Sequence, residues 1–354
     1  MAEQIPEKMR AVVLSEYREN VAEAIAGLNV QEQPVPTPGR GQVLVKIAAA
    51  PCNPSDLLLL QGKYGTLKTL PTVPGWEGAG TVVTSGGGLF ARWLLGKRVA
   101  CALMADRGGT WAEYFVADAD KCIPLKAGVS TDQGSALIIN PLTAMGLLQT
   151  AKRAGGRAAI HTAGASQVGR MLIAMAADMD YPLINVVRRD EQVELLRSLG
   201  AKHVLNLSRD DFAVELKALS DRLRATAAFE AIAGDMTGRV INAMPARSTV
   251  YVYGGLSEEA CGNIDPIGLI FQEKTVTGFY LGKWLKRRGA LGILRDAGRV
   301  QRMIIDGRIG TVIQRRVTLD DVVDGLNQYV KNMTDGKVLI MPNGLNEQSI
   351  NANP

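Results

Sequence analysis

The chain has 354 residues, of which 47% are hydrophobic and 21% are charged, and a formal net charge of +5, so it is long enough for two domains with cores of their own. Dispersed basic residues argue against a nucleic-acid groove, the lack of a long apolar run argues against a membrane span, and the start, MAEQIPEKMR, lacks the apolar core of a signal peptide. Four widely spaced cysteines without a CxxC pair argue against a disulfide framework or a structural zinc site and predict a reducing, cytoplasmic setting; they are Cys52, Cys101, Cys122 and Cys261.

The first 125 residues have the pattern of a β-rich domain. Short runs of apolar and β-branched residues alternate with Gly and Pro, as strands alternate with turns. The stretch TVPGWEGAG, residues 72–80, is typical of a tight turn that leads into a strand. The expected strands are Ala11–Leu14, Val43–Ala49, Thr81–Val83, Arg98–Leu103 and Ala112–Ala117.

Residues 126–285 change to alternating strands and helices. One helix carries an apolar stripe from Val168 to Met179, and a second, 190–199, ends at Gly200. Six strands joined by helices predict a parallel, doubly wound sheet and hence an α/β fold. The expected strands are Arg157–His161, Leu183–Val187, His203–Leu207, Thr226–Ala231, Thr249–Tyr253 and Thr275–Tyr280, followed by helices near 290–306 and 320–330 and a last strand, Lys337–Met341.

The segment 157–192 is the most informative part of the chain. It reads as a strand, a loop of small residues, an amphipathic helix and a second strand, with Ala163, Ser166 and Gly169 in an A-x-x-S-x-x-G spacing. Unpaired N–H groups and the dipole at the start of a helix favour an anion, and small residues let the backbone approach it. We therefore expect a dinucleotide pyrophosphate here, although a strict GxGxxG is absent. The alternative is a tight strand-to-helix turn without a ligand.

The end of the second strand indicates which nucleotide is preferred. NAD sites place an Asp or Glu about 20 residues beyond the loop, where it accepts a bond from the ribose 2′-hydroxyl. This chain has Arg188 and Arg189 there, 19 and 20 residues past Gly169, and Asp190 follows. Guanidinium groups suit a 2′-phosphate, so we predict NADP(H). The alternative is that both arginines form a solvated strand end.

Seven segments together resemble a known superfamily. They are NPSDLLLLQGKYG (53–65), VPGWEGAGTVV (73–83), NPLTAMGLL (140–148), the loop 161–169, NVVRR (185–189), SLGAKHVLN (198–206) and GKVLI (336–340). In them the chain resembles zinc-free members of the medium-chain dehydrogenase/reductase superfamily, in the quinone oxidoreductase and trans-2-enoyl thioester reductase branches. The resemblance implies a GroES-like β-rich catalytic domain, residues 1–125 and 286–354, and a Rossmann NADP(H)-binding domain, residues 126–285. It also implies a homodimer that pairs its sixth strands, residues 275–281.

The resemblance indicates where a zinc site would be and why we expect none. Metal-dependent relatives hold zinc with a Cys, a His and a second Cys or acid. The matching positions here are Asn53, Trp76 and the Asn140–Pro141 region, which supply no such ligands, and both histidines, His161 and His203, lie elsewhere. Without a Lewis acid an alkoxide lacks stabilisation, so alcohol oxidation is disfavoured. Delivery of a hydride to the β-carbon of a C=C bond conjugated to a carbonyl, and of a proton to the α-carbon, is easier because the charge spreads into an enolate.

Tyr64 in the segment QGKYG is the candidate proton donor. It matches the tyrosine that serves in the enoyl thioester reductases, and a phenol stays protonated at neutral pH. The alternative is a rim residue whose hydroxyl lies in water. Asn53, Trp76 and Trp284 are expected to border the substrate pocket, although Trp76 could equally pack in the core and Trp284 against a helix.

The resemblance also assigns the cofactor contacts. Pro141 is expected to interrupt a helix and so to bend the segment that borders the site. Phe279 and Leu281 have a role in the core or in a dimer as an equal alternative. The expected cofactor-binding residues are Asn140, Thr143, Gly164, Ala165, Ser166, Gln167, Val168, Arg188, Arg189, Tyr253, Gly254, Gly255, Phe279, Leu281 and Lys337.

We therefore expect an NADPH-dependent reductase of an enone, enal or 2-enoyl thioester. Quinone reduction on the same fold is the alternative within enzymes, because quinones are also conjugated acceptors. A non-catalytic NADPH-binding protein, as found among the zeta-crystallins, is the alternative of another class. The basic side chains from Lys283 to Arg288 would attract the phosphate of a CoA or carrier-protein substrate, or would simply be solvated.

Overall fold

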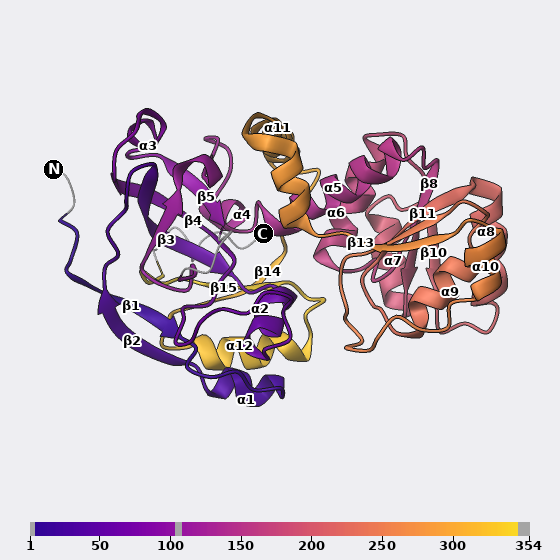
Figure 1. Ribbon diagram of the computed structural model, residues 1–354, viewed down its shortest axis with the longest axis horizontal. Coiled ribbons are helices and arrows are strands. Elements are labelled where there is room, and N and C mark those ends of the chain that lie inside the picture. Colours follow the sequence, from indigo (N-terminus) through magenta and orange to yellow (C-terminus); the bar gives the residue numbers. More distant parts are fainter. Residues whose placement is uncertain (1–3, 103–107, 346–354) are drawn as a thin grey trace. The chain divides into compact units, whose positions relative to one another are not determined.

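The computed structural model describes residues 4–102 and 108–345, and the chain divides into two units (Figure 1). Unit 1 comprises Met1–Ile139 and Ala290–Pro354, and unit 2 comprises Asn140–Gly289. In Figure 1, unit 2 carries the colours from magenta to orange, and unit 1 carries those at the two ends of the scale.

The first boundary between the units lies later in the chain than the expected residue 125. Residues 126–139 stay with unit 1: the N–H of Lys126 donates to Gln301 Oε1 at 2.8 Å, and the short helix α4 (Thr131–Ser135) packs on the strands of that unit. The second boundary falls at Gly289 rather than at residue 285. There a φ of +68° interrupts the helix α11 (Leu281–Ile305), and glycine adopts this φ without a steric penalty.

Unit 1 is built on a mixed sheet with the strand order β14-β15-β3-β4-β5-β7, in which β6 also pairs with β3, and on a smaller sheet of β1 and β2. The strands are β1 (Lys8–Val13), β2 (Asn29–Pro34), β3 (Gln42–Pro51), β4 (Glu77–Ser85), β5 (Arg98–Ala102), β6 (Tyr114–Asp118), β7 (Ile123–Pro124), β14 (Ile313–Val317) and β15 (Lys337–Ile340). The helices are α1 (Val21–Ala26), α2 (Pro54–Leu60), α3 (Leu89–Trp93), α4 (Thr131–Ser135) and α12 (Val322–Lys331). Each strand expected in this unit overlaps one of these, and Leu103 lies outside the described residues.

The stretch TVPGWEGAG forms both a turn and the start of a strand. The turn lies at Gly75, whose φ is +101°. Strand β4 begins at Glu77, before the expected start at Thr81, so Gly80 lies inside the sheet. A Cβ on Gly80 would lie 1.9 Å from the carbonyl oxygen of Lys46 in β3, so only glycine allows the two strands to come this close.

Unit 2 is the expected doubly wound sheet: within the described residues its strands run in the order β10-β9-β8-β11-β12-β13, and all pairs are parallel. The strands are β8 (Ala158–His161), β9 (Leu183–Val187), β10 (His203–Asn206), β11 (Ala225–Glu230), β12 (Thr249–Val252) and β13 (Thr275–Gly278). The helices are α5 (Ile139–Arg153), α6 (Gln167–Ala177), α7 (Asp190–Ser198), α8 (Phe212–Leu223), α9 (Asp235–Ala243) and α10 (Pro266–Phe271). The α/β fold with its β-rich and Rossmann parts is therefore confirmed.

Two local predictions in unit 2 meet different outcomes. Gly200 follows α7 with a φ of +86°, as expected of a glycine that ends a helix. Pro141 does not interrupt a helix, because it lies in the first turn of α5, where a backbone N–H has no partner within the helix.

In the described residues, no helix combines the length and the apolar character that a membrane crossing requires.

Candidate active site

The loop between β8 and α6 has the geometry of an anion site. The N–H of Gly164 donates to Val186 O at 2.9 Å, and the N–H of Gly169 donates to Oγ of Ser166, the N-cap of α6, at 3.2 Å. A Cβ on Gly169 would lie 2.1 Å from Gly164 O, so the helix approaches the loop this closely only with glycine. The backbone of residues 165–168, which includes Ala165, Gln167 and Val168, forms the end of the loop and the first turn. These features fit a dinucleotide pyrophosphate.

A buried histidine anchors the start of this loop, a role that the sequence did not reveal. His161 Nε2 lies 2.8 Å from the hydroxyl of Tyr253, and the centroids of their stacked rings are 6.1 Å apart. Burial lowers the pKa of His161 to about 3, so the imidazole is neutral at pH 7. Tyr253 also hydrogen-bonds the side chain of Ser166, which ties the end of β12, followed by Gly254 and Gly255, to the N-cap of α6.

Glu230, at the end of β11, is a buried carboxylate that the sequence analysis missed. Its Oε1 accepts from Thr162 Oγ1 at 3.0 Å and from the N–H of Ile232 at 2.8 Å. Its Oε2 accepts from the N–H of Ala233 at 2.8 Å and from Thr237 Oγ1 at 3.1 Å. Glu230 therefore holds together the loops that follow β8 and β11. A single acid at a strand end carries no sequence signal of such a role, because a solvated acid has the same pattern.

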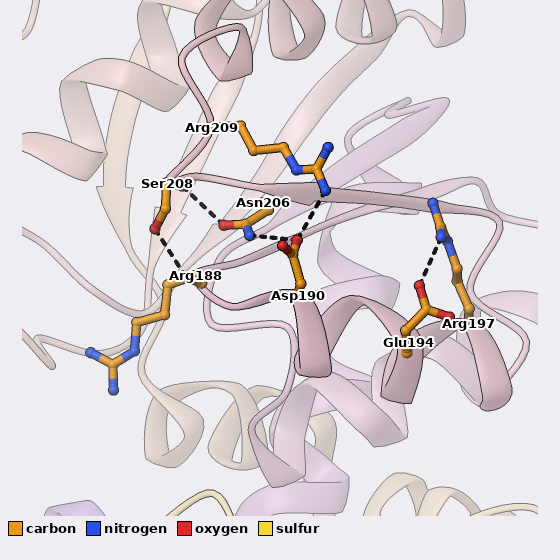
Figure 2. Close-up of polar contacts among 7 residues, drawn as sticks. All are labelled: Arg188, Asp190, Glu194, Arg197, Asn206, Ser208 and Arg209. Atoms are coloured by element: carbon orange, nitrogen blue, oxygen red, sulfur yellow. Dashed lines mark hydrogen bonds and ion pairs between the residues drawn. The ribbon is translucent and has the colours of Figure 1, made fainter.

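The end of β9 carries the charges expected for a phosphate (Figure 2). Arg188 and Arg189 are exposed, and the side chain of Arg188 points away from the neighbouring acid. That acid, Asp190, accepts hydrogen bonds from Asn206 Nδ2 at 2.9 Å and from Arg209 Nη2 at 3.1 Å. The two bonds lower the pKa of Asp190, so its carboxylate is ionised and paired. The sequence analysis predicted a phosphate contact for the two arginines and did not reveal the contact between Arg209 and Asp190.

Helix α5 begins with buried polar side chains. Asn140 and Thr143 are 6% and 8% exposed, and Asn140 Nδ2 has no hydrogen-bond partner among the described residues. A buried donor without a partner costs free energy, which a ligand carbonyl at this position would recover. Asn140 is therefore able to bind an acceptor such as a carboxamide oxygen.

Two other predicted site residues pack against α5. A Cβ on Gly146 would lie 2.8 Å from Phe279 Cζ and 3.0 Å from the ring of Trp284, and Trp284 is 7% exposed. These contacts correspond to the helix-packing alternative for Trp284. Leu281, the first residue of α11, is half-buried.

Tyr64 and Trp76 form an aromatic pair in unit 1. Their ring centroids are 4.7 Å apart, their planes are inclined by 39°, and both residues are half-buried. Lys68 Nζ lies 4.9 Å from the centroid of the Trp76 ring, a cation–π distance. The pair therefore combines a phenolic hydroxyl with an apolar aromatic surface.

A buried polar network connects Trp76 to the start of α2. The N–H of Trp76 donates to Asp56 Oδ1 at 3.1 Å, and the N–H of Asn53 donates to Asp56 Oδ2 at 2.7 Å. Asn53 Nδ2 donates to Glu77 Oε1 at 3.1 Å, and Lys337 Nζ donates to Asn53 Oδ1 at 2.8 Å. Asn53 is thus held at both polar atoms of its side chain, and Asp56 fixes the backbone at Asn53 and at Trp76.

Lys337, predicted to approach the cofactor, has three acceptors within unit 1. Besides Asn53, its ammonium donates to Cys52 O at 3.1 Å and to the hydroxyl of Tyr329 at 3.3 Å, and the residue is 3% exposed. These contacts make Lys337 a part of the buried network. The sequence analysis predicted the residue and missed these partners.

Burial dominates the electrostatics of the network. It raises the pKa of Asp56 and of Glu77 to about 7 each, and it lowers the pKa of Lys337. Hydrogen bonds oppose the effect at Glu77, where Oε2 accepts from the N–H groups of Ile138 and Ile139 at 2.9 Å each. Two acids that titrate near neutral pH therefore lie next to the Tyr64–Trp76 pair.

The donor set at the positions that match zinc ligands does not fit that metal. Asn53 uses its side chain in bonds to Glu77 and Lys337, and Trp76 offers no lone pair to a metal. Among residues 4–102 and 108–345, no group of three or more His, Cys, Asp or Glu side chains could hold a metal ion. No step that needs a metal is therefore assigned to this site.

The predicted residues thus fall into two sets. Unit 1 brings together Asn53, Tyr64, Trp76 and Lys337, through Asp56 and Glu77. Unit 2 brings the loop 164–168 together with Tyr253, while Phe279 and Trp284 lie at Gly146.

Comparison with known proteins supports two recognisable parts. Residues 39–127 match the family described as the alcohol dehydrogenase GroES-like domain, and residues 168–295 match the family described as zinc-binding dehydrogenase. A mitochondrial enoyl-[acyl-carrier-protein] reductase of Xenopus tropicalis is 30% identical over 76% of this chain and 77% of its own length. The corresponding Caenorhabditis elegans protein is 29% identical over 80% of this chain and 82% of its own.

A solved structure is similar over almost the whole chain. It is that of a candidate NADPH:quinone reductase from Mesorhizobium loti, which is 36% identical to this chain. The match covers 96% of this chain and 100% of the other, with a TM-score of 0.88.

Proposed function

We propose a function on the premise that the chain belongs to the medium-chain dehydrogenase/reductase superfamily, in the branch of quinone oxidoreductases and enoyl thioester reductases. This NADPH-dependent oxidoreductase reduces C=C bonds conjugated to a carbonyl, with a 2-enoyl thioester as its preferred acceptor. The observation that carries the proposal is the Tyr64–Trp76 pair, with its ring centroids 4.7 Å apart. The phenol of Tyr64 supplies a hydrogen that it can donate to a polarised carbonyl, and the two rings supply an apolar surface for an acyl chain.

The roles of the side chains follow from their chemistry. Bound NADPH supplies the hydride for the β-carbon. Tyr64 donates a hydrogen bond to the carbonyl oxygen, where negative charge develops, or a proton to the α-carbon. Trp76 borders the acyl chain, and Asn53 and Asp56 hold Trp76 and the start of α2 in place. In this proposal Tyr64 is the catalytic residue, and Asn53 and Asp56 are positioning residues.

The cofactor is assigned to unit 2. The loop 164–168 takes the pyrophosphate, Asn140 and Thr143 face the nicotinamide carboxamide, and Arg188 with Arg189 takes the 2′-phosphate. Tyr253, Gly254, Gly255, Phe279 and Leu281 are the further predicted contacts in unit 2, whereas Lys337, also predicted from the sequence, is held in the buried network of unit 1. Two observations support this assignment: the buried amide nitrogen of Asn140 has no hydrogen-bond partner among the described residues, and Gly169 approaches the carbonyl oxygen of Gly164 too closely for any other residue.

The reaction is proposed to be independent of zinc. The chemistry of the donor set supports this, since Asn53 and Trp76 replace the soft ligands that zinc requires. Activity that survives dialysis against a chelator, with less than one zinc per chain by elemental analysis, is the expected result. Loss of activity that added zinc restores would contradict it.

A panel of acceptors tests the proposed function. NADPH oxidation is followed with trans-2-enoyl-CoA esters, a cyclic enone and benzoquinone, with a saturated acyl-CoA as the control. We expect the highest kcat/KM with the enoyl-CoA esters and none with the saturated ester. Turnover of benzoquinone alone would replace the proposal with the second candidate, quinone reduction, which the similarity to the Mesorhizobium loti protein favours. Cofactor binding without any turnover would indicate a non-catalytic protein.

We also propose a cytoplasmic homodimer. Strand β13 is an edge of the sheet in unit 2, and its exposed residues are preceded by Ile270 and Phe271, which are 66% and 74% exposed. An exposed strand edge beside apolar side chains favours pairing with a second copy. Sedimentation equilibrium should give twice the mass of the chain, and a monomer at micromolar concentration would contradict the dimer.

The buried thiols of Cys52, Cys101 and Cys122, which form no disulfide, support a reducing compartment.

A further inference from the structure

Asp190 poses a problem for the proposed 2′-phosphate site. It directly follows the two arginines assigned to the phosphate, and its side chain is 65% exposed. An unpaired carboxylate there would repel a phosphate and would accept a bond from a ribose hydroxyl instead. The position of Asp190 in the sequence would therefore weaken discrimination between the two nicotinamide cofactors.

The segment 206–209 provides the counter-charge (Figure 2). Asn206 Nδ2 and Arg209 Nη2 both bind Oδ1 of Asp190, at 2.9 Å and 3.1 Å. The segment itself is fixed, because Ser208 Oγ donates to Arg188 O at 2.9 Å and the N–H of Ser208 donates to Asn206 Oδ1 at 3.0 Å. Arg209, which follows β10, is thus held next to the end of β9, where the two arginines lie.

We propose that Arg209 determines the preference for NADP(H) by neutralising Asp190, a role that rests on the proposed cofactor site. Arg209 is a positioning residue in this sense: it acts on the phosphate through the acid. The pKa of Asp190 is lowered, first by the bond from Asn206 and then by Arg209, so the acid stays ionised and its charge needs a partner. With that partner, the field at the strand end is set by Arg188 and Arg189.

Helix α7, which begins at Asp190, offers a matched control. Arg197 pairs with Glu194 on α7 at 2.9 Å, and its side chain is 61% exposed, compared with 62% for Arg209 (Figure 2). Arg197→Ala removes the same charge from an equally exposed ion pair. An effect of Arg209→Ala that Arg197→Ala does not reproduce therefore reports on position and not on net charge.

Calorimetric titration of the full chain with 2′,5′-ADP and 5′-AMP tests the proposal without turnover. Arg209→Ala should weaken 2′,5′-ADP binding about tenfold and change 5′-AMP binding by less than about twofold. Arg209→Lys should restore most of the loss, and Arg197→Ala should stay within about twofold of the wild type for both ligands. Thermal unfolding of each variant checks that the fold is retained.

A double substitution separates an action through Asp190 from direct contact with the phosphate. In an Asp190→Asn background, Arg209→Ala should change 2′,5′-ADP binding by less than about threefold, because no acid remains to neutralise. An undiminished loss in that background, or a loss no larger than that of Arg197→Ala, would overturn the proposal. A wild type that binds both ligands equally would overturn the phosphate site and this role with it. Failure of the enoyl reductase assignment would leave these titrations unchanged.

Discussion

Unit 1 and unit 2 hold their candidate functional side chains in opposite surroundings. Around Trp76 in unit 1, the supporting groups Asp56, Glu77 and Lys337 are at most 3% exposed. At the ends of β9 and β10 in unit 2, Asp190 and Arg209 are 65% and 62% exposed. Buried polar groups have no water to replace a lost partner, whereas exposed charges are solvated and screened. Unit 1 should therefore respond strongly to loss of single hydrogen bonds, and the strand end of unit 2 weakly and in a salt-dependent way.

The largest expected effect is that of Glu77→Gln. The amide can offer its oxygen to the N–H groups of Ile138 and Ile139, but its NH2 group then faces Asn53 Nδ2, another donor. A flip of Asn53 only moves the conflict to Lys337, whose ammonium donates to Asn53 Oδ1. We expect the free energy of unfolding to fall by about 3 kcal/mol in urea denaturation.

Glu32→Gln is the control for Glu77→Gln. Glu32 pairs with Lys8 in unit 1, but its side chain is 66% exposed. Its loss should change the free energy of unfolding by less than about 0.5 kcal/mol. Equal effects of the two substitutions would remove the contrast between buried and exposed groups.

The next effect concerns catalysis. Tyr64→Phe removes the hydroxyl and keeps the ring against Trp76, so kcat should fall about 100-fold while NADPH affinity stays nearly unchanged. Steady-state kinetics with an enoyl-CoA ester and fluorescence titration with NADPH measure the two quantities. An unaffected kcat would assign Tyr64 to the alternative of a rim residue.

Sequence patterns predicted the fold better than they predicted the buried network of unit 1. Strand periodicity and the parallel-crossover rule located every strand of unit 2, because these depend on neighbours in the chain. The bond between Lys337 and Asn53 joins residues 284 positions apart, and no local pattern reports such a contact. Strand β2 and helix α1 were missed for another reason: they are short, and β2 is mostly polar.

The candidate site also divides into residues that a local sequence pattern indicates and residues that only the fold brings together. Arg188 and Arg189 could be proposed from the sequence because their predicted role depends on distance along the chain from Gly169. Arg209 could not, since its partner Asp190 lies on another strand end. Trp284 has a residue type that suits a pocket wall and helix packing equally well, and its contact with Gly146 is visible only in the structure.

A smaller effect is expected from the pH dependence of stability. The pKa of Asp56 is raised to about 7 in the folded chain from an ordinary 3.8, so the folded state binds the proton more tightly. Its contribution to stability is complete below the ordinary pKa and is lost as the pH rises toward 7. The destabilisation caused by Asp56→Asn should therefore be larger at pH 5 than at pH 8, by about 2 kcal/mol in urea denaturation. A larger destabilisation at pH 8 would show that hydrogen bonds to the carboxylate outweigh its burial.

The smallest effect, and the one most sensitive to salt, is that of Arg188→Ala. Removal of one exposed guanidinium should lower kcat/KM for NADPH about tenfold and leave that for NADH within about twofold. The difference should shrink as ionic strength rises, because exposed charges are screened, whereas the effect of Glu77→Gln should not. Arg247→Ala, which removes an arginine paired with Glu273 and 79% exposed, is the matched control in the same unit. Equal losses with both cofactors would give Arg188 a general role in positioning the nucleotide, and no loss with either would make the arginine pair a solvated strand end.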